Sequence, residues 1–398
     1  MNPFNKDISG HYASEKRTIL SLCEKLAGVS LAELARVLDT SIPRISRIVA
    51  EMVDDGFLVD LGKQESANGR KPSLYGLNPK AGYFVGTDVD EDDFTLAVMD
   101  FQGKVVCSCD GISYSLRNTE ESVLGFCAKV DEVLDAARVD KSLVRSYGVN
   151  LTGRVNFATG YSYSYFISEE KPIRAILEQG FGKPVSVEND SCGMAYGEYM
   201  TAMPGDTGTL LFLNLGRGLG MGMVMDGKLF TGKSGFSGEV GHFPLLDNNV
   251  LCRCGKRGCL ETGASGIALR RMFIERLRGG QTSLLSPAFN ENRTVSISDI
   301  LGAIDKEDIT AIECMEEVGS TLGRAVAGLI NIFNPDIVTI GGRLSAAERY
   351  LMPPLKSAVN KYSLNLVSSD TVIRVSQLGA KAGAIGAGLL AKNRLLNN

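Results

Sequence analysis

The chain has 398 residues, of which 44% are hydrophobic and 22% are charged, and its formal net charge is −4. This length exceeds one ordinary hydrophobic core, so two or three domains are expected, and no apolar run is long enough to span a membrane. The acidic balance excludes a general nucleic-acid binder that relies on net charge alone.

The N-terminal residues 1–17 lack the apolar stretch of a signal peptide, so a cytoplasmic location is expected. In that reducing compartment the nine cysteines are expected to be free thiols or metal ligands rather than disulfides. Residues 1–82 carry a formal charge of +1 and the remainder −5. Any DNA contact must therefore come from a few basic side chains placed in the head.

Residues 14–54 predict three helices by the spacing of their apolar positions. Ser14 is the expected N-cap of the first helix, which ends before Gly28. Ser30 and Glu33 have the spacing of a capping box at the start of the second helix. Pro43 lies in the first turn of the third helix, where the missing N–H is tolerated.

The second and third of these helices predict a helix-turn-helix, whose DNA-reading residues lie at the start of the third helix. The candidates there are Ser41, Arg44, Ser46 and Arg47. Residues 57–79 predict a strand, a polar tip and a second strand, which would form a wing with Arg70 and Lys71 at its tip. Residues 1–82 are thus interpreted as an α+β winged helix-turn-helix domain. The alternative is a packing module whose arginines are only solvated.

From Tyr83 onward, β-rich runs alternate with helical patterns, which indicates an α/β class. Two strand-rich starts, each followed by a turn, suggest a duplicated pair of domains with a cleft between them. The expected bounds are 83–198, joined by a C-terminal helix at 380–398, and 199–379.

Several segments of the body carry a family resemblance. "VENDSCGMAYGE", "GRGLGMGMVMDGKLFTG", "GEVGH", "CRCGKRGCLE", "NIFNPDIVTIGGRLS" and "AGAIGAGLL" occur in this order. Residues 83–395 thereby resemble the ROK family of sugar kinases and sugar-responsive repressors. The resemblance implies an actin-like, hexokinase-type two-domain ATPase fold. A DNA-binding head ahead of that body is the layout of the family's repressors.

"CRCGKRGC" places three thiols within eight residues, which is typical of a metal site. The resemblance supplies the fourth ligand, so a structural Zn²⁺ is expected on His242, Cys252, Cys254 and Cys259. The alternative is a reduced cysteine cluster without metal. The resemblance also implies that the metal fixes the tautomer of His242 in a sugar site formed by Gly153, Asn189, Asp190, Glu239, His242 and Glu261.

Asp190 matches the general base of the family's kinases and would be catalytic only if kinase activity persists. The nucleotide side is predicted to be degenerate. Asp88 matches the first phosphate turn, but Asp90, Glu91 and Asp92 replace its Gly-Gly-Thr, and their carboxylates would repel a triphosphate. The remaining nucleotide-side candidates are Gly216, Gly218, Gly220, Gly341 and Gly342. ATP and magnesium are therefore not expected as cofactors, and the chain is not expected to be an enzyme.

The hypothesis is a sugar-responsive transcriptional regulator, expected to be a repressor. It would bind double-stranded operator DNA and a sugar or sugar-phosphate effector as a homodimer or tetramer, with a dimer surface in 199–379. It would lie in the cytoplasm, on the bacterial nucleoid when bound to its operator. One alternative is an active ATP-dependent sugar kinase with a regulatory head. Another is a DNA-binding regulator controlled by a protein partner.

Overall fold

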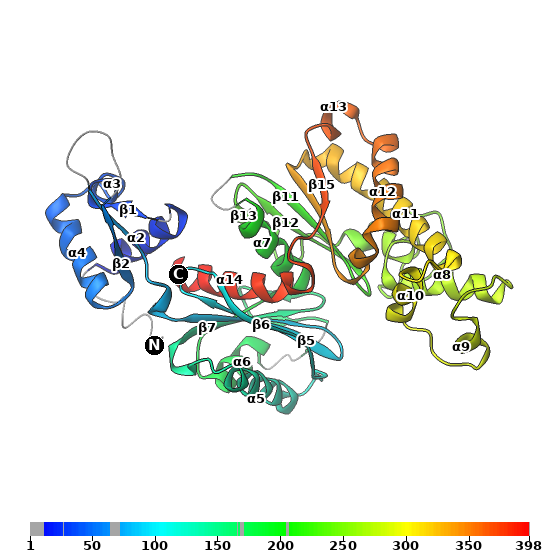
Figure 1. Ribbon diagram of the computed structural model, residues 1–398, viewed down its shortest axis with the longest axis horizontal. Coiled ribbons are helices and arrows are strands. Elements are labelled where there is room, and N and C mark those ends of the chain that lie inside the picture. Colours follow the sequence, from blue (N-terminus) through cyan, green and yellow to red (C-terminus); the bar gives the residue numbers. More distant parts are fainter. Residues whose placement is uncertain are drawn as a thin grey trace. The chain divides into compact units, whose positions relative to one another are not determined.

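The computed structural model describes residues 12–26, 28–63, 72–164, 166–167, 171–203 and 207–397. The chain divides into two compact units, Met1–Gly205 with Lys381–Asn398, and Asp206–Ala380. Figure 1 shows the elements of both units. Strands and helices alternate along the chain, which confirms the predicted α/β class of the body. No helix in the described residues is long and apolar enough to cross a membrane.

The head combines three helices with a small antiparallel sheet. Apolar residues on one face of each helix build its core, among them Ile19, Leu34, Ile45 and Ile48, all fully buried. The sheet has the order β1-β3-β2. The elements are α2 (Ala13–Leu26), β1 (Val29–Ser30), α3 (Leu31–Val37), α4 (Ile42–Asp54), β2 (Leu58–Lys63) and β3 (Ser73–Leu77).

The head follows its sequence pattern except at the start of α2. The capping box is present, since Ser30 Oγ accepts from the Glu33 N–H and the Glu33 side chain accepts from the Ser30 N–H. The predicted N-cap at Ser14 is wrong, because α2 already begins at Ala13. The expected wing tip, with Arg70 and Lys71, lies outside the described residues.

The rest of the first unit is a five-stranded sheet in the order β10-β7-β4-β5-β6, covered by helices on both faces. Alternating apolar residues of β4 and β7 bury one face against α5 and α6. The long strands and helices are β4 (Tyr83–Val89), β5 (Asp93–Asp100), β6 (Val105–Ser113), α5 (Glu120–Ala136), β7 (Val144–Leu151), α6 (Ile173–Phe181) and β10 (Val185–Asn189). A two-stranded ribbon joins β8 (Val155–Asn156) to β9 (Tyr161–Ser162).

The other face of this sheet carries α7 (Asp190–Ala202) and the C-terminal α14 (Ala382–Asn397), drawn in red in Figure 1. Glycines let α14 approach the backbone of the sheet and of α7. A β-carbon on Gly86 of β4 would lie 1.9 Å from the Ala384 carbonyl oxygen, and one on Gly386 would lie 1.8 Å from the Gly193 oxygen. The glycines of "AGAIGAGLL" thus allow α14 to pack closely against the sheet and α7.

The second unit repeats this strand arrangement. In each five-stranded sheet the first three strands in chain order form an antiparallel meander, and two later strands add in parallel beside the first, giving the order β13-β12-β11-β14-β15 here. The strands are β11 (Leu210–Leu215), β12 (Leu219–Met225), β13 (Lys228–Leu229), β14 (Ile337–Gly341) and β15 (Val372–Val375). The repeated order fits the duplication expected from the two strand-rich starts.

The helices of the second unit bury its core around α11. Their apolar faces include Phe273, Val318, Leu322 and Leu355, all fully buried. The helices are α8 (Gly266–Arg278), α9 (Ser286–Asn290), α10 (Ile297–Ile304), α11 (Ile309–Phe333), α12 (Glu348–Tyr362) and α13 (Asn365–Ser368).

The segment "GRGLGMG" (216–222) lies mostly in strand β12. Leu215 pairs with Leu219, and Asn214 pairs with Gly220, so β11 and β12 form a tight hairpin. Only residues 216–218 form the turn, and Gly220 is a strand residue. The apolar residues between the glycines extend the ladder, which the glycine count alone did not reveal.

Candidate functional site

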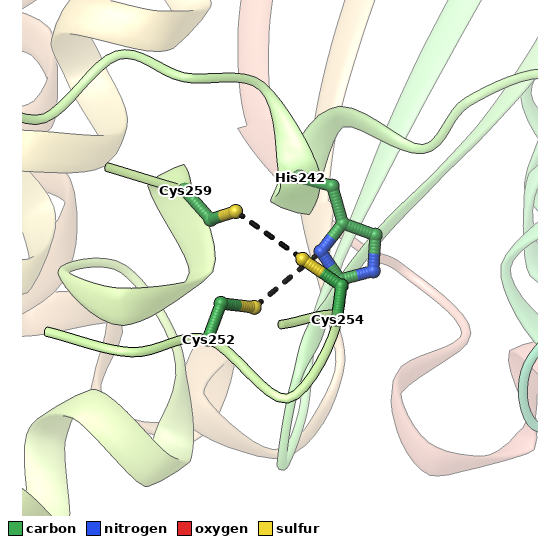
Figure 2. A group of neighbouring side chains, drawn as sticks. All are labelled: His242, Cys252, Cys254 and Cys259. Atoms are coloured by element: carbon green, nitrogen blue, oxygen red, sulfur yellow. Dashed lines mark hydrogen bonds between the residues drawn. The ribbon is translucent and has the colours of Figure 1, made fainter. Parts of the chain in front are cut away.

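Three cysteines and one histidine converge in the second unit. The Cys252 Sγ lies 3.6 Å from the His242 Nδ1, and the Cys254 Sγ lies 3.6 Å from the Cys259 Sγ. All four ligand atoms lie within 4.8 Å of one another, and Figure 2 shows the side chains pointing toward a common centre. A tetrahedral zinc with Zn–S bonds of about 2.3 Å needs ligand atoms about 3.8 Å apart. The donor set and its spacing therefore fit a metal ion.

The local chain geometry explains how these ligands meet. His242 ends a short 3₁₀ helix, Val240–His242, and a bridge between Pro244 and Cys259 holds that segment beside the cysteine loop. Gly255 has φ of +83° and Gly258 of +78°, which glycine adopts without strain. These two turns fold the eight-residue loop back on itself, so that Cys254 and Cys259 face each other.

The protonation of the thiols bears on metal binding. Burial raises the pKa of Cys252, and it raises that of Cys259 to about 12. A hydrogen bond from the Lys256 backbone lowers the pKa of Cys254. Metal binding requires thiolates, so it releases protons from the two buried thiols.

The histidine presents its second nitrogen to an acid. His242 Nε2 lies 3.6 Å from the Glu239 Oε2, while Nδ1 faces the cysteines. When Nδ1 binds a metal ion, the ring proton stays on Nε2, and this N–H then donates outward. His242 is only partly buried, so this donor and Glu239 can meet a polar ligand.

Glu261, the remaining sugar-site candidate of this unit, lies beside the cysteine loop. Its Oε1 is 3.8 Å from the Cys252 Sγ and 4.0 Å from the Arg253 Nε. Its Oε2 accepts from the Leu219 N–H at 3.1 Å. The buried carboxylate therefore connects the cysteine loop to the β11–β12 hairpin, a contact between distant segments that no local motif signals.

A second polar cluster lies in the first unit, where β10 meets α7. Asn189 Nδ2 donates to the Gly153 carbonyl oxygen and to the Asp190 Oδ1, each at 2.8 Å. The Ser191 N–H also donates to Asp190 Oδ1, at 2.7 Å. The structure thus brings together the three sugar-site candidates of this unit, Gly153, Asn189 and Asp190.

Asp190 and Asp88 have raised pKa values for the same reason. Burial raises the pKa of Asp190 to about 6. Burial, and next the neighbouring Asp190 carboxylate, raise the pKa of Asp88 well above its usual range. Asp88 Oδ1 and the Asn150 Oδ1 are both buried without a hydrogen-bond donor in the described residues. A proton on Asp88 reduces the cost of burying two carboxyl groups side by side.

The acidic turn between β4 and β5 uses its own backbone donors. The Asp90 N–H donates to the Asp93 carbonyl oxygen at 2.9 Å, and the Glu91 N–H donates to the Asp90 Oδ1 at 2.9 Å. The Ser115 hydroxyl donates to the Glu91 carbonyl oxygen. Two amides of this turn are therefore already bonded within it, and exposed carboxylates surround them.

The glycines predicted for the nucleotide side have packing roles in the second unit. A β-carbon on Gly341 would lie 2.1 Å from the Phe212 ring, and one on Gly218 would lie 2.6 Å from the Glu261 Oε2. Gly342 has φ of +81°. The Gly216 carbonyl oxygen accepts from the Gly266 N–H at the start of α8. Close packing or a positive φ thus explains a glycine at positions 218, 341 and 342.

The start of α4 presents the four described DNA-binding candidates, Ser41, Arg44, Ser46 and Arg47, as exposed residues. Both guanidinium groups lie over the Tyr12 ring, 5.1 and 5.2 Å from its centroid, and Arg47 also donates to the Tyr12 hydroxyl. Arg44 pairs with Glu15 at 2.7 Å. Tyr12 could not be predicted as a partner of these arginines, because it lies before the first helix and no sequence pattern links it to α4.

Known proteins share this architecture. Residues 84–394 match the model of the ROK family. The chain belongs to the ROK family. It is 27% identical over 365 residues to a putative xylose repressor of Caldicellulosiruptor sp. (strain Rt8B.4), covering 90% of each chain. It is 29% identical over 315 residues to a glucokinase of Halalkalibacterium halodurans, covering 78% of this chain and 96% of the enzyme.

A solved ROK family transcriptional regulator, described as a homolog of the E. coli MLC protein, superimposes with a TM-score of 0.80 at 26% identity. The match covers 99% of this chain and 97% of that one. The repressor-type matches thus run through the head, whereas the glucokinase match covers 78% of the chain. The actin-like sugar kinase fold expected of the body is confirmed by these relatives.

Proposed function

We propose that this ROK family protein is a sugar-responsive transcriptional repressor. One observation carries the proposal: the helix pair α3 and α4, with exposed arginines at the start of α4, precedes a body with the sugar kinase fold, and the similarity to repressors extends over both parts. DNA would be read by the start of α4, where Arg44 and Arg47 are exposed. Arginines at this position of a helix-turn-helix reach base edges in the major groove.

Zinc is the metal proposed for the Cys252, Cys254, Cys259 and His242 group. Three thiolates and one imidazole in a tetrahedral arrangement suit Zn²⁺, which binds structural sites of this kind with four protein ligands. The metal would hold the cysteine loop and the His242 ring together, and it would leave Nε2 as a fixed donor. The role proposed for zinc is therefore structural.

The effector proposed is a sugar or sugar phosphate. In the second unit, His242 Nε2 and Glu239 offer a donor and an acceptor 3.6 Å apart, a spacing suited to neighbouring hydroxyl groups. In the first unit, Asn189 and Asp190 offer the same kind of pair. Glu261 is proposed to support the site through Leu219 and the cysteine loop, since its carboxylate already accepts a backbone hydrogen bond.

Phosphoryl transfer is not proposed as the activity. Kinases of this kind work by holding phosphates with backbone amides and cations. Here two amides of the Asp90–Asp93 turn bond within the turn, and the side chains there are carboxylates. Asp190 favours the kinase alternative, because a pKa of about 6 suits a general base. Release of ADP that depends on a sugar would establish that alternative.

The assembly proposed is a homodimer or tetramer in the cytoplasm, bound to the nucleoid through paired operator half-sites. Two heads on one operator match the two-fold symmetry of most helix-turn-helix complexes. Selection of DNA from a random-sequence library, followed by sequencing, tests this directly. A palindromic consensus is expected. The absence of any enriched sequence would contradict operator binding.

A further inference from the structure

A lysine of the C-terminal helix is buried against the head. Lys392 lies on α14 with a side chain that is 1% exposed, and its Nζ is 2.8 Å from the Glu24 Oε1 on α2. A β-carbon on Gly103 would lie 3.3 Å from the same Nζ, so the ammonium group also sits against the β5–β6 turn. A buried ammonium group is strongly unfavourable without a partner. Glu24 is the acid that pairs with it in the described part of the chain.

The helix that carries Lys392 begins beside the buried carboxyl groups of Asp88 and Asp190, here called the acidic cluster. Asn150 Nδ2 donates to the Gly383 carbonyl oxygen at 2.8 Å. The Asp88 carboxyl group lies against Gly383, where a β-carbon would be 2.2 Å from the Asp88 Cγ. The first turn of α14 thus contacts Asp88, whose pKa responds to Asp190. A change in charge or position at this cluster acts directly on the start of α14.

A second helix connects the same two places. Asp190 is the first residue of α7, and Tyr196 lies almost two turns further along. Tyr196 is buried, and the Glu24 carboxylate is among the groups that raise its pKa, after burial itself. Both helices that begin at the acidic cluster therefore extend to the surroundings of Glu24.

Other contacts between head and body are of another kind. The Phe57 and Phe101 rings pack at 5.9 Å, and Gln102 Nε2 donates to the Leu77 carbonyl oxygen at 2.8 Å. Arg145 donates to the Ala81 carbonyl oxygen. These contacts hold the end of the head where the chain enters the body. None of these three contacts involves α2, whereas the Glu24–Lys392 pair does.

We propose that the Glu24–Lys392 ion pair sets the orientation of α2 and thereby the affinity of the head for operator DNA. The pair is also the contact through which α14 and α7 carry effector occupancy at the Asp88 and Asp190 cluster to the head. This second part rests on the proposed function. The first part concerns DNA affinity alone and is tested separately.

The first test measures operator affinity by fluorescence anisotropy, with a DNA probe selected by the wild-type protein. Glu24→Gln and Lys392→Met are each expected to weaken binding at least about tenfold, within the usual range of allosteric coupling. The double variant is expected to bind no more weakly than either single variant, because the two changes remove the same contact. The charge swap, Glu24→Lys with Lys392→Glu, is expected to restore most of the affinity.

Asp54→Asn is the matched control, because it removes one exposed acidic charge from the head without touching α14. Circular dichroism and metal content would establish that each variant is folded. Single variants that bind the probe within twofold of the control would overturn the proposal. Losses of DNA-binding free energy that add in the double variant would also overturn the proposal.

The second test adds D-glucose, D-xylose, N-acetylglucosamine and the 6-phosphates of the two hexoses. For a sugar that alters wild-type affinity, Glu24→Gln and Lys392→Met are expected to reduce that change to less than about twofold, while the sugar still raises the melting temperature. Variants that keep the wild-type response would refute transmission through the pair. If no sugar changes the DNA affinity of the wild-type protein, the proposed function is refuted, and so is the transmission of effector binding through the pair. The first test would still decide the role of the pair in DNA affinity.

Discussion

Replacing Asp190 by asparagine is expected to stabilise the first unit at neutral pH. It is also expected to remove the pH dependence that this carboxyl group gives to the free energy of unfolding. The Asp190 Oδ1 accepts hydrogen bonds from the Asn189 side chain, from the Ser191 N–H and from the Ser191 hydroxyl. Asparagine has an acceptor oxygen that can take this place. The substitution therefore mainly removes a charge that is disfavoured by burial.

The size of the effect follows from the pKa of Asp190, which is raised from an ordinary 3.8 to about 6. Below both values the group is protonated in the folded and unfolded states and has no effect on stability. As the pH rises through 3.8, only the unfolded state releases the proton, so the free energy of unfolding falls until the folded state also ionises near pH 6. The loss reaches about 3 kcal/mol at pH 7.5 and is about 1 kcal/mol at pH 4.5.

Hydrogen exchange in urea, followed by mass spectrometry of β7 and α7 peptides, would report the stability of this unit by itself. The gain from Asp190→Asn over wild type is expected to be about 2 kcal/mol larger at pH 7.5 than at pH 4.5. Asp110→Asn, an exposed position on β6, is the control and is expected to show no such difference. An Asp190→Asn variant less stable than wild type at pH 7.5 would refute the reasoning.

Three further predictions concern DNA, metal and nucleotide. Arg44→Ala and Arg47→Ala should each weaken operator binding, measured by anisotropy between about 50 and 200 mM salt. If the arginine contacts a phosphate, its loss should also reduce the slope of log affinity against log salt concentration by about one. Unchanged affinity in both variants would contradict the assignment of α4 to DNA binding. Cys254→Ser should abolish bound zinc in elemental analysis and lower the melting temperature, whereas Cys107→Ser should do neither. Replacing Asp90, Glu91 and Asp92 by Gly, Gly and Thr should make Mg-ATP raise the melting temperature, which it should not do for the wild type. A rise in the wild type would contradict the prediction that its nucleotide site is degenerate.

Much of the fold could be predicted from local patterns. The capping box at Ser30 and the proline at the start of α4 act within one turn of helix, so the residues that form them are neighbours in the sequence. The α/β class of the body could be predicted from β-rich runs that alternate with helical patterns. The metal group was predictable because three of its ligands are within eight residues, and the family resemblance added His242.

Other contacts could not be predicted, because they join distant parts of the sequence. Glu261 turns toward Leu219 and the cysteine loop, because folding brings the β11–β12 hairpin beside it. The stacking of Tyr12 and the burial of Lys392 likewise join residues far apart in sequence, which periodicity cannot reveal.

The most direct test of the account is operator binding with and without sugar, followed in the same samples by an assay for ADP. The wild-type protein, loaded with zinc, would be titrated onto its selected DNA with each sugar, in the presence and absence of Mg-ATP. The account predicts that one sugar class changes the DNA affinity at least about tenfold, without help from ATP and without ADP release. ADP release that depends on the sugar, or DNA affinity that no sugar changes, would contradict it.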